Sequence, residues 1–177
     1  MDDFKCFPKI SRLSREMVIT EKIDGTNGLI YISDTNEMKI GSRSQWIAPQ
    51  KDNHGFALWA TQHKEELLTL GPGYHYGEWW GTGIQRKYDL SEKRFSLFRV
   101  DKWSEIRPAC CHVVPTLYQG VFDTTIADEV LKELLKTGSK AAPGYMYPEG
   151  IVIFHIASRV SFKHTLDDRR KSDGPSV

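Results

Sequence analysis

The N-terminal part of the chain is organised around residues 17–32, MVITEKIDGTNGLIYI. The first four residues of this stretch are apolar or β-branched and predict a strand, and its last five predict the next one. Between them, Asp24-Gly25 predicts a turn, because both residue types adopt turn geometry readily. Lys22 therefore stands at a strand end, from which an amine can project into a cleft. The same pattern also fits an ordinary strand-end turn with a solvated lysine.

The rest of the chain contains two helical patterns and several strand patterns. Amphipathic spacing predicts one helix over residues 53–70 and a second that is capped by Thr124 or Thr125 and ended by Gly138. Further strands are predicted at 38–40, 74–80, 94–101, 111–118, 151–154 and 160–163. Because proline cannot donate a backbone hydrogen bond, Pro115 predicts that 111–118 is an edge strand or contains a bulge. Because strands dominate both ends of the chain, we expect an α+β fold of mainly antiparallel sheets flanked by helices.

Length and composition indicate a single soluble domain. The 177 residues suit one domain, which we expect over 1–166, with the polar residues 167–177 as a flexible tail. Lys+Arg 24 against Asp+Glu 23 gives a net charge of +1, so contact with nucleic acid would need a local basic patch. Cys6, Cys110 and Cys111 fit neither a disulfide framework nor a zinc motif. Without a signal peptide or an apolar span, we expect a cytoplasmic protein with no membrane contact.

Three further motifs place charged residues beside apolar strands. Residues 77–81, GEWWG, set the carboxylate of Glu78 between bulky rings, where it can bond a ribose hydroxyl or a metal-bound water. Residues 148–152, PEGIV, start a strand with Glu149, and residues 160–163, VSFK, place Lys163 among apolar neighbours. Each motif alone is also compatible with ordinary core or surface packing.

Taken in order, these motifs resemble those of the covalent nucleotidyltransferases, the superfamily of ATP-dependent DNA ligases, RNA ligases and mRNA capping enzymes. The resemblance spans about Val18 to Lys163 and includes Phe-Arg-Val at 98–100. Asn27 stands where DNA ligases and capping enzymes usually have Arg, so the chain is most similar to the RNA ligase branch typified by the second RNA ligase of phage T4. Residues 41–44, GSRS, and 114–120, VPTLYQG, also match that branch. The resemblance implies an ATP-grasp-like ligase catalytic domain.

The resemblance also implies a role for each motif residue. Lys22 would be the nucleophile that attacks the α-phosphorus of ATP and forms a covalent lysyl-AMP. Glu21 would recognise the adenine edge, Phe98 would stack on adenine and Glu78 would bind ribose. The remaining expected contacts are Ile23 and Asn27 to the nucleotide, Arg43 to the nucleotide or the 5′-phosphate end, Glu149 to a divalent metal (Mg²⁺ or Mn²⁺), and Lys163 to the α-phosphate.

The implied activity is that of an ATP-dependent RNA ligase, which transfers AMP to a 5′-phosphate end before a 3′-hydroxyl seals the strand. A protonated lysine cannot attack, and a nearby cation, here Lys163 or the metal, would favour the neutral amine. Arg86 and Lys87 are candidate nucleic-acid contacts if basic residues gather on one face. Two alternatives stay open: a nucleotidyltransferase that adenylylates or guanylylates another acceptor, and a non-catalytic nucleotide- or RNA-end-binding module.

Two features depart from the family pattern. Ser161 stands where the closing motif usually has a first lysine, so one positive charge against the α-phosphate is missing unless Arg159 or the metal supplies it. Only sixteen residues precede Met17 and fourteen follow Lys163, so we expect no accessory domain. A partner protein could then replace that domain, and with a net charge of +1 the chain should bind nucleic-acid ends, RNA favoured, weakly and in a salt-sensitive way.

Overall fold

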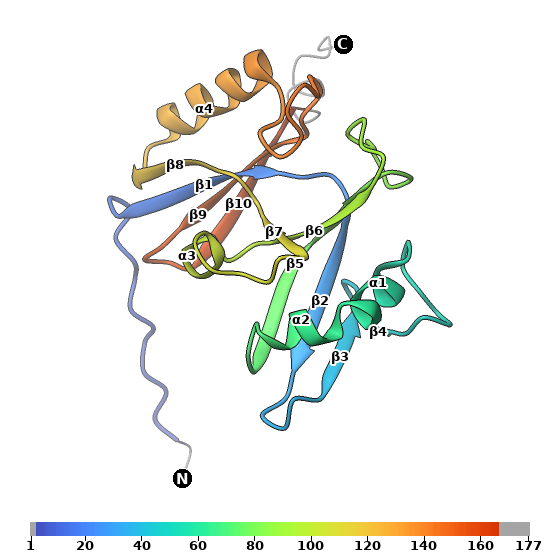
Figure 1. Cartoon of the computed structure of the whole chain (residues 1–177). Coiled ribbons are helices and arrows are strands. Elements are labelled where there is room, and N and C mark those ends of the chain that lie inside the picture. The colour runs from blue at the N-terminus through green and yellow to red at the C-terminus, as the bar shows by residue number, and fades with distance from the viewer. Residues whose placement is uncertain (1–2, 167–177) are drawn as a thin grey trace, which may run out of the picture.

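The computed structural model describes residues 3–166, which form two β-sheets and four helices (Figure 1). The four-stranded sheet has the order β10-β9-β1-β8, with β1 Glu16–Lys22, β8 Thr116–Val121, β9 Gly150–His155 and β10 Val160–Thr165. The six-stranded sheet has the order β4-β3-β2-β5-β6-β7, with β2 Thr26–Ile32, β3 Met38–Gly41, β4 Trp46–Ile47, β5 Gly73–Gly81, β6 Lys93–Leu97 and β7 Cys111–Val113. All neighbouring strands are antiparallel except β6 and β7. The predicted α+β fold of mainly antiparallel sheets is confirmed.

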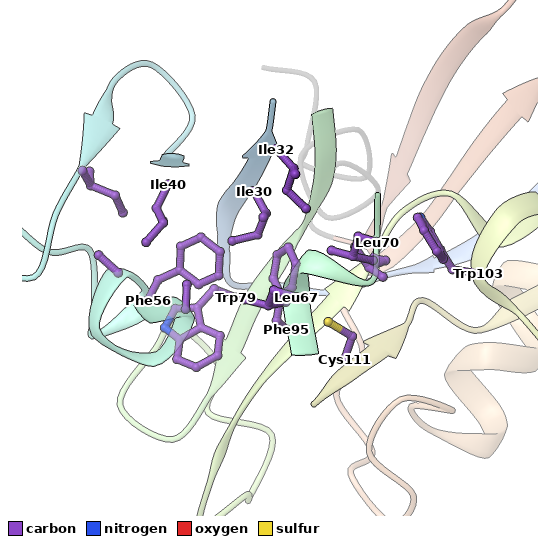
Figure 2. Packing of buried hydrophobic residues seen from close by; sticks show 14 of the residues in the cluster. Ile30, Ile32, Ile40, Phe56, Leu67, Leu70, Trp79, Phe95, Trp103 and Cys111 are labelled. Carbon is purple, nitrogen blue, oxygen red and sulfur yellow. The ribbon is translucent and has the colours of Figure 1, made fainter. Parts of the chain in front are cut away.

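The helices cover one face of each sheet (Figure 1). α1 Phe56–Gln62 and α2 Lys64–Leu68 pack on the six-stranded sheet, where the buried cluster drawn in Figure 2 includes Phe56, Trp79 and Phe95. α4 Thr124–Thr137 packs on the four-stranded sheet through a second buried cluster that includes Leu131. Full burial of a side chain such as Leu131 contributes about 1.5–3 kcal/mol, so each sheet has its own stabilised face. The fourth helix, α3 Val100–Trp103, follows β6.

The chain passes from one sheet to the other directly after Lys22. β1 ends at Lys22 in the four-stranded sheet, and β2 begins at Thr26 in the six-stranded sheet. A Cβ on Gly25 would lie 2.4 Å from the carbonyl oxygen of Trp79, so a side chain at this position would collide with β5. The turn predicted at Asp24-Gly25 is therefore a change of sheet, and it places residues 22–27 where the two sheets meet.

The predicted helix over residues 53–70 is two helices. The helical path breaks at His63, whose φ of −102° lies outside the α region, and the His63 Nδ1 lies 2.9 Å from the carbonyl oxygen of Trp59. The second predicted helix begins one residue earlier than expected, because the Asp123 side chain accepts a hydrogen bond of 2.7 Å from the Thr125 backbone N–H. Asp123 is thus the N-cap, and the expectation for Thr124 or Thr125 was wrong.

Two predicted strands are shorter than expected. The strand predicted over 94–101 ends at Leu97, and α3 follows from Val100. The strand predicted over 111–118 is divided at Pro115 into β7 and β8, which belong to different sheets. This division agrees with the expectation that Pro115 interrupts pairing, since proline offers no backbone N–H to a ladder. No helix within residues 3–166 is long and apolar enough to cross a membrane, and the predicted tail at 167–177 lies outside the described residues.

Candidate active site

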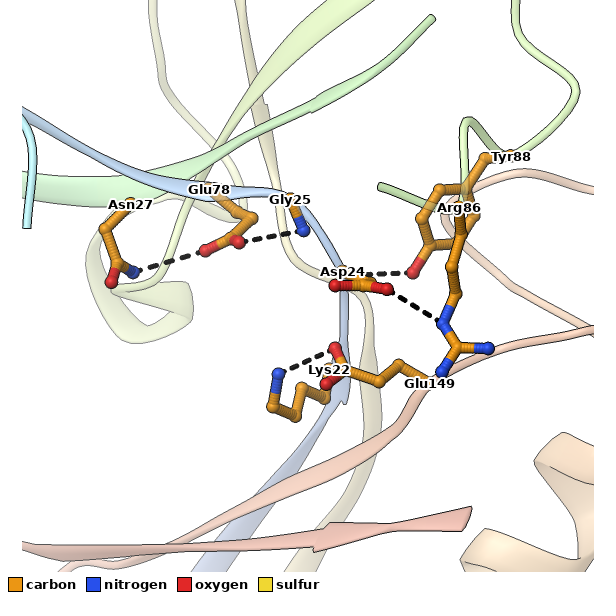
Figure 3. A network of polar contacts seen from close by, with 8 residues as sticks. All are labelled: Lys22, Asp24, Gly25, Asn27, Glu78, Arg86, Tyr88 and Glu149. Atoms are coloured by element: carbon orange, nitrogen blue, oxygen red, sulfur yellow. Dashed lines mark hydrogen bonds and ion pairs between the residues drawn. The ribbon is translucent and has the colours of Figure 1, made fainter. Parts of the chain in front are cut away.

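Strand pairing brings the sequence motifs together where the two sheets meet. Lys22 is paired with Gly150, which follows Glu149, so the end of β1 lies beside the start of β9. In the other sheet, Asn27 on β2 is paired with Glu78 on β5. Figure 3 shows the resulting polar network, to which β1, β2, β5 and the start of β9 all contribute. Residues that are more than fifty positions apart in sequence thus form one site.

Lys22 forms an ion pair with Glu149. The Lys22 Nζ lies 2.6 Å from the Glu149 Oε2, and the two side chains are 25% and 15% exposed. Burial raises the pKa of Glu149, whereas the hydrogen bond and the charge of Lys22 act to lower it. In this pair the Lys22 amine donates a hydrogen bond to Glu149, so its nitrogen is not free to attack an electrophile. Lys22 must therefore lose this proton and this partner before it can act as a nucleophile.

Glu78 connects the sheet crossing to β2. Its carboxylate accepts hydrogen bonds from the Gly25 backbone N–H at 3.0 Å and from the Asn27 Nδ2 at 3.3 Å. Burial raises the pKa of Glu78 to about 7, the charge of Lys22 and the Gly25 hydrogen bond oppose the rise, and the charge of Glu149 adds to it. Without a ligand, this carboxyl group is therefore partly protonated at neutral pH and is available to accept from or donate to a sugar hydroxyl.

Glu78→Gln is expected to stabilise the ligand-free protein at pH 8 by about 3 kcal/mol, and to change its stability little below pH about 4. The pKa of Glu78 in the folded protein lies above its ordinary value of 4.5, so the parent loses stability as the pH rises from about 4.5 to about 7. Glutamine does not ionise and escapes this loss, while its carbonyl oxygen can still accept from Gly25. Urea unfolding at several pH values measures the difference.

The matched control is Glu65→Gln, which replaces an exposed glutamate in α2. This variant should follow the stability of the parent across the whole pH range. A Glu78→Gln variant that is less stable than the parent at pH 8 would contradict the raised pKa of Glu78.

Asp24 is held from two sides by the loop between β5 and β6. Its carboxylate lies 2.9 Å from the Arg86 Nε, and its backbone N–H donates to the Tyr88 hydroxyl at 2.7 Å. Tyr88 is 1% exposed, and its ring packs edge-on against Trp80 with centroids 4.9 Å apart. Burial raises the pKa of Tyr88, so its hydroxyl stays protonated and orients the turn after Lys22 as a neutral group.

This supporting loop has an unusual backbone. Gln85, Lys87, Tyr88 and Asp89 all have positive φ values, between 43° and 62°. Such conformations are costly for residues other than glycine and persist only where the surrounding structure enforces them. Here the burial of Tyr88 provides that enforcement, so the strained backbone is maintained close to Asp24 and the turn after Lys22.

Glu21 lies on the opposite face of β1 from Lys22, because side chains alternate along a strand. It is 1% exposed, and its carboxylate accepts hydrogen bonds from the Ser139 hydroxyl and from the backbone N–H groups of Lys140, at 2.7 Å, and Ala141, at 2.9 Å. Burial raises the pKa of Glu21, and these hydrogen bonds counteract the rise. A carboxylate has about four acceptor positions, so one remains for a further donor such as an adenine amino group.

The remaining predicted residues lie around this network. Lys163 is paired with Val152, which is paired with Thr20, so Lys163 shares a sheet face with Lys22 and is exposed. The backbone N–H of Phe98 donates to the Tyr76 carbonyl oxygen at 3.0 Å, which places the 40% exposed Phe98 side chain on the face of Glu78.

Four further predicted residues lie in or near the network. Arg43 is exposed in the turn after β3 and lines a surface pocket together with Thr26. Lys87 is exposed, whereas Arg86 is turned toward Asp24, and Ile23 is buried beneath the crossing. The structure therefore groups Lys22, Glu78, Asn27 and Glu149, and it sets Glu21 behind them.

A divalent metal is compatible with the carboxylates present. Within residues 3–166, no group of three or more His, Cys, Asp or Glu side chains is arranged to hold a metal ion without other ligands. Mg²⁺ commonly uses only one or two protein carboxylates and takes its other ligands from phosphates and water. Glu149, which adjoins Lys22, and Asp24 in the same network offer such oxygen donors.

Two supporting elements of this site were not anticipated from the sequence, namely Tyr88 and the 139–141 loop. Tyr88 is separated from Asp24 by 64 residues, and Ser139 from Glu21 by 118 residues. Neither stretch has a motif of its own. Tyr88 itself, the only aromatic residue in the polar stretch 81–94, was the available signal, because a buried tyrosine needs a partner for its hydroxyl.

Comparison with known proteins yields a family match and structural matches. The family model described as RNA ligase matches residues 15–169. A Naegleria gruberi RNA ligase variant solved with ATP and Mn is 18% identical, with a TM-score of 0.65 over 90% of this chain and 51% of that one. A second variant of that enzyme, solved with AMP and Mn, is 19% identical, with a TM-score of 0.64 over 90% of this chain and 52% of that one. No curated protein matches the chain.

The structural matches agree with the fold described above. At 18–19% identity they show a shared fold, and the chain spans about half the length of these solved structures. The particular similarity to the phage T4 branch is not tested by them and stays a prediction.

Proposed function

Because the chain belongs to the RNA ligase family, whose model matches residues 15–169, we propose that it is an ATP-dependent RNA ligase that acts through a covalent lysyl-AMP. The observation that supports this most directly is the position of Lys22. Its amine lies where the two sheets meet, 2.6 Å from Glu149 and in the same polar network as Glu78 and Asp24.

In the first step, the neutral amine of Lys22 attacks the α-phosphorus of ATP, the new N–P bond forms, and pyrophosphate leaves. Glu149 is the carboxylate nearest to the Lys22 amine, and when it binds a metal instead, the proton of Lys22 passes to solvent. Glu78 and Asn27 bind the ribose, Ile23 lies beneath the nucleotide, Phe98 stacks on adenine, and Glu21 offers its remaining acceptor position to the base. Lys163 and Arg43 approach the phosphates, where positive charge stabilises the transition state.

A divalent metal, Mg²⁺ or Mn²⁺, would be held by Glu149 with help from Asp24, and when bound it supplies positive charge to the phosphate oxygens. The Naegleria structures were solved with Mn and either ATP or AMP, which is consistent with this ligand pair. The competition between a cation and Lys22 for Glu149 gives a reason for the amine to be released from its ion pair.

In the later steps, AMP passes from Lys22 to a 5′-phosphate end, and a 3′-hydroxyl then displaces AMP to close the strand. Nucleic-acid ends, RNA favoured, are the proposed partners, with Lys87 as a candidate phosphate contact. A partner protein that assists RNA binding and a cytoplasmic location remain part of the proposal. The three cysteines, of which Cys110 and Cys111 have sulfur atoms 3.9 Å apart, are free, as is usual in a reducing compartment.

Incubation with ATP and Mg²⁺ followed by intact-mass measurement and a strand-joining assay tests the proposal. A covalent gain of one AMP is expected, together with joining of 5′-phosphorylated RNA, either nicked or single-stranded. AMP gain without joining would indicate a transferase that uses another acceptor. Binding of ATP without any covalent gain would indicate a non-catalytic module.

Ser161→Lys is expected to raise the rate of lysine adenylylation about two- to tenfold, since it adds positive charge toward the phosphates. Ser161 is paired with Phe154 and lies two residues from Lys163 on the same sheet face. The initial rate of AMP labelling measures the effect. Val121→Lys adds the same charge at the far end of the four-stranded sheet and should leave the rate unchanged. An unchanged rate in Ser161→Lys would show that serine at position 161 does not slow lysine adenylylation.

A further inference from the structure

Four aromatic side chains lie on one face of the six-stranded sheet without being part of its buried cluster. They are Tyr31, Trp46, Tyr74 and Tyr76, and we call them the aromatic face. Trp46, Tyr74 and Tyr76 are 51%, 58% and 53% exposed. The ring centroids of Tyr31 and Tyr74 are 4.6 Å apart, those of Tyr31 and Trp46 6.2 Å, and those of Tyr74 and Tyr76 6.3 Å. The rings therefore form a connected surface and not scattered single residues.

The aromatic face continues directly from the candidate active site. Along the β2–β5 pair, Asn27 is opposite Glu78, the next pair on the same face joins Leu29 to Tyr76, and the one after it joins Tyr31 to Tyr74. Residues two apart on a strand point to the same side, so Glu78, Tyr76 and Tyr74 share one direction. The surface that begins at the proposed ribose contact thus becomes aromatic within two residues.

The exposed fraction of the β5 side chains on this face rises with distance from the sheet crossing. Trp80, two residues after Glu78 on β5, is 1% exposed, whereas Tyr76, two residues before Glu78, is 53% exposed. A nucleotide bound at Glu78 would therefore have a closed wall on one side and open rings on the other.

Neighbouring residues leave room for the aromatic face and place positive charge at its margin. Gly41 lies between Leu29 and Trp46, and a Cβ there would be 3.2 Å from Leu29 Cδ2 and 3.3 Å from Trp46 Cε3, so a side chain would separate the two. Lys39 is paired with Tyr31 and is exposed, and Arg43 follows two residues after the end of β3. Flat rings with lysine and arginine at the margin suit bases and phosphates.

We propose that the aromatic face binds unpaired bases of the RNA strand whose end is joined at Lys22. The inference rests on the proposed function and extends it to the surface that positions the substrate. Single-stranded RNA is recognised by stacking of splayed bases on aromatic side chains, including those exposed on a sheet. The continuity of the aromatic face with Glu78 and Phe98 favours a nucleic-acid strand over an unrelated partner, because the strand end must reach this point.

The test is fluorescence anisotropy with a short 5′-phosphorylated, fluorescein-labelled oligouridine in the absence of ATP. The double variant Tyr74→Ala/Tyr76→Ala is expected to bind about fivefold more weakly, or worse, for each ring removed. Tyr74→Phe/Tyr76→Phe keeps both rings and should bind within about twofold of the parent, since stacking uses the ring face. Phe7→Ala removes an aromatic ring that is 83% exposed but lies outside the sheets, and it should also bind as the parent does.

Covalent AMP labelling separates this proposal from the proposed function. The double alanine variant should label Lys22 as the parent does, because neither tyrosine belongs to the nucleotide site. Intact labelling with unchanged oligouridine binding would overturn the aromatic-face proposal and leave the enzyme assignment standing. If the parent protein is never labelled with AMP but the double alanine variant binds oligouridine more weakly than the parent, the proposed ligase activity is contradicted and the aromatic-face proposal is supported.

Two further outcomes decide the proposal. If the parent is a dimer by size-exclusion chromatography and the double alanine variant is a monomer, a second copy covers the aromatic face and the proposal is overturned. If the alanine variant does not fold, photocross-linking of 5-iodouridine RNA to the parent replaces it. Cross-links within Gly73–Gly81 support the proposal, and cross-links found only elsewhere refute it.

Discussion

Lys22→Ala is expected to abolish covalent AMP labelling, with a fall in rate of at least about a thousandfold. The amine of Lys22 is the proposed nucleophile, and alanine removes the atom that forms the N–P bond. The polar network around it contains no second lysine in contact with Glu149 among the contacts described for residues 3–166. Intact mass after incubation with ATP and Mg²⁺ measures the result.

Lys163→Ala is the informative comparison for this variant. Lys163 shares the sheet face of Lys22 but lies on the edge strand β10 and is exposed. Its loss should slow labelling without abolishing it, since it contributes charge and not the reacting atom. Normal labelling of Lys22→Ala would show that another residue accepts AMP, and peptide mapping would then identify it.

Glu21→Ala is expected to lower the free energy of unfolding by about 3 kcal/mol. Truncation leaves the Ser139 hydroxyl and the backbone N–H groups of Lys140 and Ala141 without their shared acceptor in a buried site. It also opens a cavity beneath β1, at a position that is 1% exposed. For a chain of this size, that loss corresponds to a melting temperature lower by about 6–12 °C.

Glu21→Gln separates the packing role of this residue from its charge. Both backbone donors bond the same carboxylate oxygen, Oε2, so the amide oxygen of glutamine can take that position while its NH₂ donates to the Ser139 hydroxyl. We therefore expect a loss below about 1 kcal/mol in thermal or urea unfolding. If Glu21→Ala were as stable as the parent, the 139–141 loop would not depend on this carboxylate.

Much of the architecture could be predicted from local patterns. The stretch at residues 17–32 has apolar strands on both sides of Asp24-Gly25, and the structure places β1 and β2 there. The α+β fold with antiparallel sheets followed from many short strands and few helices. The breaks at His63 and after Leu97 did not follow, because helical spacing and strand alternation both continue through them.

The motif residues of the candidate site could be predicted from the sequence, but the residues that hold Asp24 and Glu21 in place could not. The order of the motifs suggested that Lys22, Glu78 and Glu149 would meet, and strand pairing brings them together. The partners of Asp24 come from the loop between β5 and β6, which has a strained backbone. The partners of Glu21 come from the segment after α4. Such contacts depend on the complete tertiary arrangement, so no local spacing encodes them.

The position of the two sheet crossings has a consequence for motion. Within residues 3–166 the chain leaves the four-stranded sheet at residues 23–25 and returns at 114–115. The exit and return points are adjacent, since the Glu21 backbone N–H donates to the Pro115 carbonyl oxygen at 2.9 Å. Because both crossings lie together near Lys22, a rotation of one sheet against the other about this point would move the far ends of the sheets more than it would move Lys22.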